Sequence, residues 1–140
     1  MRAVKRIRIY CPILKDTFVA LSQGDLSAIE RDPAAARMLA IIRAENPLGD
    51  FGLYKGVFEL SLGIEGFTPT ARAAPAAGTA GSSTLSPTAV ITTYIDAATD
   101  NKPLRTVLER LLAAHPWETP VIEISNEPVL LLEHDAQISK

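Results

Sequence analysis

Residues 113–124, Ala-Ala-His-Pro-Trp-Glu-Thr-Pro-Val-Ile-Glu-Ile, contain the end of a helix, a turn and the start of a strand. His115 precedes Pro116, and a residue before proline is disfavoured in the α region, so the apolar helix predicted over 104–114 ends there. Residues 121–124 restart with apolar, β-branched side chains that favour a strand. The turn holds an imidazole, an indole and a carboxylate, which makes it the first candidate for a functional site.

The chain before this stretch begins with a strand and continues with helices. Residues 6–10 alternate charged and apolar side chains, the period of a strand with one buried face. Residues 16–29 and 34–44 carry apolar side chains in a helical pattern, interrupted by Gly24, and Pro33 suits the first turn of the second segment. We therefore expect two helical segments or one broken helix.

The second half repeats the order of strand and helix. Turn residues at 46–50 precede a strand predicted over 53–62, and the Thr-, Val- and Ile-rich run 88–94 predicts another. Residues 103–114 place Leu and Val on one stripe of a helix, and 129–132 are expected to form a short edge element.

Residues 71–87 are rich in Ala, Gly, Ser and Pro and contain a single charge, Arg72. Such a segment inside a compact domain is either functional or poorly ordered. The composition allows two interpretations of this segment, a mobile connector or an ordered lid over a substrate.

Two β–α–β halves in this order predict an α+β fold, a ferredoxin-like β-α-β-β-α-β sandwich. Its antiparallel sheet would carry helices on one face, with an extra helix in the first half and the long Ala/Gly/Ser/Pro loop. A chain of 140 residues fits a single domain, residues 1–140.

Composition limits the functions to consider. Hydrophobic residues make up 47% and charged residues 21%, which is typical of a globular domain, and the formal net charge of −2 argues against a nucleic-acid partner. No apolar run is long enough to span a bilayer, so no membrane association is expected. Cys11 is the only cysteine, which excludes an intrachain disulfide and makes a reducing, cytoplasmic location the default. It is expected to be a small buried side chain rather than a nucleophile.

His115 and Glu118 are the residues of the turn most suited to chemistry. Together they could form an acid–base pair or supply two ligands to a divalent metal, although two ligands are too few for a closed zinc site. His115 could instead cap the last carbonyls of its helix.

An aromatic cleft could surround this turn. Trp117 is the only tryptophan, and its indole either packs against the core or an interface or presents a face to a ligand. If the fold is ferredoxin-like, Tyr54 and Phe67 would flank the same edge of the sheet, with Glu65 and Glu118 as acids.

Four motifs resemble the Nif-three-like family, in particular its YqfO-like inserted domain, which is similar to CutA and P-II proteins. They are Ile-Tyr-Cys-Pro at 9–12, Gly-Leu-Tyr at 52–54, Gly-Ile-Glu-Gly-Phe-Thr-Pro at 63–69 and His-Pro-Trp-Glu-Thr-Pro at 115–120. The last is the most specific. The resemblance touches most of residues 7–13 and 50–125.

The chain also departs from the family pattern. Leu53, Thr68 and Thr119 stand where the family has asparagine, arginine and glutamate, residues 23–46 have no counterpart, and the family's outer domains with their dinuclear metal site are absent. The resemblance implies a ferredoxin-like fold, association in trimers, and a binding or sensing role.

Three functions follow as expectations. The first is a small oligomeric ligand-binding or regulatory module, trimeric by resemblance, that holds a small molecule or divalent metal near His115, Trp117 and Glu118. The alternative is an enzyme acting on a small polar substrate, with His115 as general base, Glu118 orienting it and Tyr54 as an acid or hydrogen-bond donor. A structural partner module with a docking loop is the third. The cofactor, if any, is not specified by the sequence.

Overall fold

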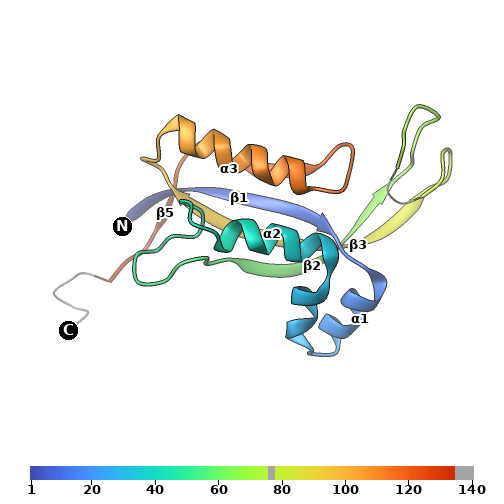
Figure 1. The fold of residues 1–140 in the computed structure, drawn as a ribbon, viewed down its shortest axis with the longest axis horizontal. Coiled ribbons are helices and arrows are strands. Elements are labelled where there is room, and N and C mark those ends of the chain that lie inside the picture. Colours follow the sequence, from blue (N-terminus) through green and yellow to red (C-terminus); the bar gives the residue numbers. More distant parts are fainter. Residues whose placement is uncertain (76–77, 135–140) are drawn as a thin grey trace.

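The computed structural model, which describes residues 1–75 and 78–134, contains a five-stranded antiparallel sheet (Figure 1). Strands β1 (Arg2–Pro12) and β3 (Thr84–Asp96) form its centre, and β2 (Glu59–Phe67) and β4 (Val121–Ile124) lie at its edges in the order β2-β3-β1-β4. A short strand, β5 (Val129–Leu131), pairs with the start of β1.

The helices follow the order that the sequence predicts. Helix α1 (Lys15–Ser22), the 3₁₀ helix η1 (Leu26–Arg31) and helix α2 (Pro33–Arg43) connect β1 to β2, and α3 (Asn101–Ala114) connects β3 to β4. This is the β-α-β-β-α-β connection of a ferredoxin-like sandwich with additional helix in the first half. The predicted α+β fold class is confirmed.

One face of the sheet packs against the helices, and no helix of the described residues covers the other face. Alternate residues of β1 (Ile7, Ile9 and Cys11) are fully buried in the core, because successive side chains of a strand point to opposite faces. The core also takes in side chains of β3, α2 and α3: Ala89, Ile91, Ile95, Met38, Leu39, Ile42, Val107 and Leu111. The intervening β1 residues point to the second face, which we call the helix-free face.

The strand predicted over 53–62 starts later than expected, at Glu59. Residues 49–57 form turns instead, with Gly49, Gly52 and Gly56 at positive φ. A Cβ at Gly49 would lie 2.6 Å from the backbone N and O of Val57, so this turn requires glycine. The short-range alternation of apolar residues there indicated a strand, and the tertiary turn overrode it.

Two other boundaries differ from the sequence predictions. Strand β3 begins at Thr84, so residues 84–87, which composition placed in the loop 71–87, belong to the sheet. Strand β1 is also longer than the predicted 6–10. In the described parts of the chain no helix has both the length and the apolar character needed to cross a membrane.

Asp32 ties the start of α1 to the start of α2, a role that its sequence context does not indicate. Its buried carboxylate accepts hydrogen bonds from the backbone N of Leu14 (2.9 Å), the Thr17 hydroxyl (2.7 Å) and the backbone N of Ala35 (3.1 Å). The last of these caps α2, and the other two hold the start of α1.

We predict that Asp32→Ala lowers the free energy of unfolding by about 3 kcal/mol, because it removes a helix cap and leaves buried donors unpaired. Urea denaturation measures this. Asp25→Ala is the control: Asp25 pairs with Arg31 on the surface, and its loss should change stability far less. Equal losses in the two variants would contradict the role given to Asp32.

Candidate functional site

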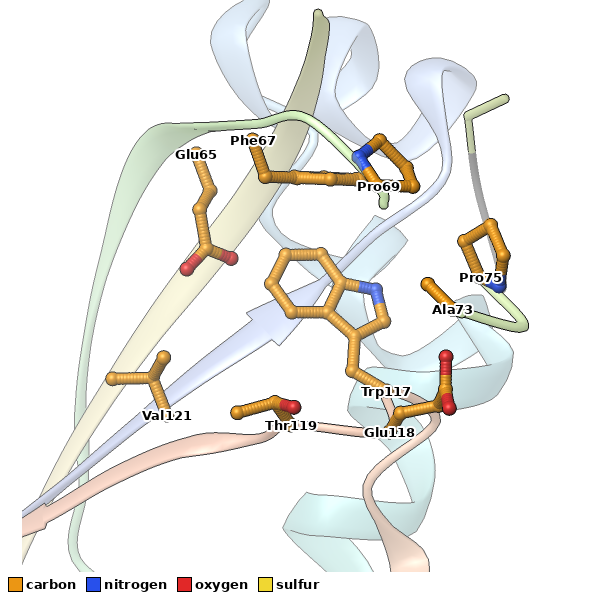
Figure 2. Close-up of a pocket in the computed structure, with 9 residues that line it drawn as sticks. All are labelled: Glu65, Phe67, Pro69, Ala73, Pro75, Trp117, Glu118, Thr119 and Val121. Carbon is orange, nitrogen blue, oxygen red and sulfur yellow. The ribbon is translucent and has the colours of Figure 1, made fainter. Parts of the chain in front are cut away.

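A cleft of about 320 Å³ lies on the helix-free face, where the turn after α3 meets the segment that follows β2 (Figure 2). Strand β2 contributes Glu65 and Phe67, and the turn after α3 contributes Trp117 and Glu118. The remaining lining residues are Pro69, Ala73, Pro75, Thr119 and Val121. The cleft is mainly apolar, with carboxylates as its charged groups.

Sheet register brings both edges of the sheet to this cleft. Glu65 pairs with Ser86 of β3, and Val121 of β4 pairs with Tyr10 of β1. All of these residues alternate with core residues, so their side chains lie on the helix-free face. Glu65 and Val121 therefore share one cleft although they lie on opposite edge strands.

His115 fixes the turn onto the central strand. Its Nε2 lies 2.8 Å from the carbonyl oxygen of Tyr10, and its Nδ1 accepts a hydrogen bond from the backbone N of Trp117 at 3.2 Å. These contacts require the neutral tautomer that carries its proton on Nε2. Burial lowers the pKa of His115, with the Tyr10 carbonyl opposing the shift, so the neutral form is favoured.

Trp117 forms the central wall of the cleft. Its indole meets the rings of Phe67 and His115 edge to face, with ring centroids 5.5 Å and 5.9 Å apart. In Figure 2 the indole is seen face-on, with Glu65 and Val121 to one side of it and Ala73 and Pro75 to the other. The indole thus lies between two groups of lining residues.

Glu118 joins the two segments that enclose the cleft. Its Oε1 accepts a hydrogen bond from the backbone N of Ala74 at 2.6 Å, and this contact links positions 44 residues apart. The segment 69–75 is held over the cleft by this contact and by the hydrogen bond from the backbone N of Gly81 to the carbonyl of Pro69 (2.7 Å). Glu118 consequently bonds to the loop rather than to His115.

Glu65 is the unusual group of the site. Its Oε2 is buried and has no hydrogen-bond partner within residues 1–75 and 78–134. Burial raises the pKa of the carboxyl group, because the ionised form is poorly solvated there. A buried acceptor without a partner costs about 1–3 kcal/mol, so a ligand that donates a hydrogen bond or carries a positive charge would relieve that cost.

The structure brings together five of the residues singled out from the sequence and leaves out one. His115, Trp117, Glu118, Phe67 and Glu65 lie at the cleft or directly behind its wall. Tyr54 does not join them: it is 73% exposed in the turn 49–57, and that turn is anchored on Tyr94, towards the other end of β3.

The cleft also contains residues that the sequence analysis did not select, namely Pro69, Ala73, Pro75 and Val121. The first three lie at or near the start of the Ala/Gly/Ser/Pro segment, whose possible role as a lid was the only sequence signal for them. Cys11 is buried in the core, and burial raises its pKa to about 12, so its thiol stays protonated.

The described residues contain no group of three or more His, Cys, Asp and Glu side chains that could hold a metal ion. Glu65 and Glu118 both line the cleft, but Glu118 is already engaged with Ala74. The arrangement favours an organic ligand, which would use the aromatic walls as well as the acid.

Comparison with solved structures supports the fold. The chain is similar to the crystal structure of a Bacillus cereus protein related to NIF3, with a TM-score of 0.57 and 17% sequence identity. The match covers 91% of this chain but 26% of the other, so the chain spans about a quarter of that protein. No protein-family model and no curated protein sequence matches the chain. The structural likeness shows a fold shared with part of a NIF3-related protein.

We predict that His115→Ala lowers the free energy of unfolding at pH 7.5 by about 2–3 kcal/mol, because it removes two hydrogen bonds of about 1 kcal/mol each and a buried ring. Thermal or urea denaturation measures the change. His134→Ala, which alters an exposed histidine, is the control and should have no effect.

The same histidine should give stability a pH dependence. Since its folded pKa lies below the ordinary value of 6.5, the unfolded chain takes up the proton first, and stability falls as pH drops below about 6.5. His115→Ala should remove this component and His134→Ala should keep it. An unchanged acid profile in His115→Ala would contradict the assignment.

Proposed function

We propose that this chain is a small-molecule-binding module whose ligand occupies the cleft between β2 and the turn after α3. The observation that carries the proposal is the buried Oε2 of Glu65, which lies in an apolar cleft and has no hydrogen-bond partner among residues 1–75 and 78–134. Binding sites of this kind combine apolar walls with a few polar groups that orient the ligand. The cost of keeping the acid buried is explained if a ligand completes its hydrogen bonding.

We propose further that the chain acts as a homo-oligomer, a trimer as its resemblance to the Nif-three-like family implies. In the described parts of the chain, β2 pairs with β3 alone and its outer edge is unpaired; Ile64 and Leu62 on this strand are 67% and 37% exposed. Association would cover such an edge. A regulatory role would follow if ligand binding changed this association.

The alternative of an enzyme with His115 as general base has no support in this geometry. Both ring nitrogens are engaged with backbone groups, Glu118 bonds to Ala74, and Tyr54 lies outside the site. A general base needs a free nitrogen within reach of a substrate proton.

Native mass spectrometry of freshly purified protein tests both proposals at once. We expect three copies of the 15.1 kDa chain and an added mass from a co-purifying small molecule. A bare monomer at tens of micromolar would contradict them.

A substitution that fills the cleft, compared with a control outside it, tests where the ligand binds. Val121→Phe adds a ring inside the cleft and should remove the bound mass while leaving the fold intact. Ile124→Phe makes a comparable change on the same strand but outside the cleft, where Ile124 is 39% exposed, and should retain the ligand. Retention of the ligand by Val121→Phe would place the site elsewhere.

A further inference from the structure

The charged side chains that line the cleft are all acidic. Its lining contains two carboxylates, Glu65 and Glu118, and no lysine, arginine or histidine among the residues that the structure describes. Glu118 has one oxygen bonded to Ala74, whereas Glu65 has a buried oxygen that no described residue contacts by a hydrogen bond. A negatively charged ligand would therefore meet two acids and no compensating base.

The aromatic walls lie next to this acid. Trp117 and Phe67 line the same cleft as Glu65, and Figure 2 shows the Glu65 carboxylate directed into the space between the indole and Val121. A cation over an indole face is stabilised by about 0.5–2 kcal/mol. A carboxylate beside the ring adds a charge-assisted hydrogen bond from an ammonium group.

We propose that the ligand is an organic cation, an amine or ammonium group attached to an apolar or aromatic body. The ammonium group pairs with Glu65 beside Trp117, and the body packs against Phe67, Pro69 and Pro75. This inference rests on the proposed function of the cleft as a ligand site and adds the chemical class of the ligand.

A bare metal ion fits this cleft less well. Cation sites for Ca²⁺ or Mg²⁺ need several oxygen ligands, and among the described lining residues only Glu65 offers a free buried carboxylate oxygen. The extensive aromatic and proline surface would contribute nothing to such an ion. An organic cation would use both the Glu65 carboxylate and the aromatic and proline surface.

Fluorescence of Trp117, the only tryptophan in the chain, reports occupancy directly. Three probes share one body and differ in charge: 2-phenylethylammonium, 2-phenylethanol and phenylacetate. At pH 7.5 we expect the ammonium probe to bind at least about tenfold more tightly than the alcohol, and phenylacetate to be the weakest.

Glu65→Gln tests the residue that carries the inference. It keeps the shape of the side chain and should reduce the affinity for the ammonium probe by about tenfold or more, while the affinity for the alcohol changes little. Glu59→Gln is the matched control, since Glu59 lies on the same strand and the same face but is exposed and outside the cleft. It should bind all three probes as the wild type does.

The outcomes separate this inference from the proposed function. The proposal of a cationic ligand is wrong if 2-phenylethanol or phenylacetate binds as tightly as the amine. It is also wrong if the Glu65→Gln variant binds the amine with unchanged affinity. In either case, loss of probe binding in the Val121→Phe variant would still support the cleft as a ligand site. If no probe alters Trp117 emission, the cation inference fails, and native mass spectrometry alone decides the proposed function.

Discussion

The imidazole of His115 is the contact on which the candidate site depends. Through Nε2 it holds the carbonyl of Tyr10 in the middle of the sheet, and through Nδ1 it holds the amide of Trp117 in the turn. The turn after α3 is thereby fixed to β1, and the indole is placed on the helix-free face. Because the ring works only in its neutral form, the geometry of the cleft is tied to the protonation of one residue.

The candidate site also depends on the order of the strands in the sheet. Placing β1 and β3 at the centre puts β2 and β4 on opposite edges, so a cleft that uses both edges must span the helix-free face. Trp117 and the segment after β2, linked by the bond from Ala74 to Glu118, enclose that space. The result is an apolar cleft around a carboxylate whose burial disfavours its charge.

The sequence predicts the architecture because most of the signals are local. Alternation in β1, the helical stripe of α3 and the proline after His115 all depend on neighbouring residues. The start of β2 could not be predicted in this way, because Gly49 turns the chain against Val57 and Tyr94 through tertiary contacts. The prediction that Tyr54 flanks the site is wrong for the same reason, because residues 49–57 form turns and the strand begins only at Glu59.

The site was only partly predictable. The chemistry of four residues singles them out in the sequence, and the fold brings them together: Trp117, Glu118, Phe67 and Glu65. Only the structure shows that one Glu65 oxygen lacks a hydrogen-bond partner within the described residues. Whether His115 acts as a base or as a structural contact was also undecided by sequence. The structure shows a structural contact: the Nε2 of His115 bonds to the carbonyl of Tyr10, which lies 105 positions away in the sequence.

The central claim is that the Glu65 carboxyl group keeps a buried oxygen free for a hydrogen bond from a ligand. Titration of its side-chain carboxyl carbon by NMR, assigned by comparison with Glu65→Gln, measures this most directly. We predict a pKa clearly above the ordinary value of 4.5 in the free protein. A pKa at or below 4.5 would show that the carboxylate is already well solvated or paired, and would contradict the account.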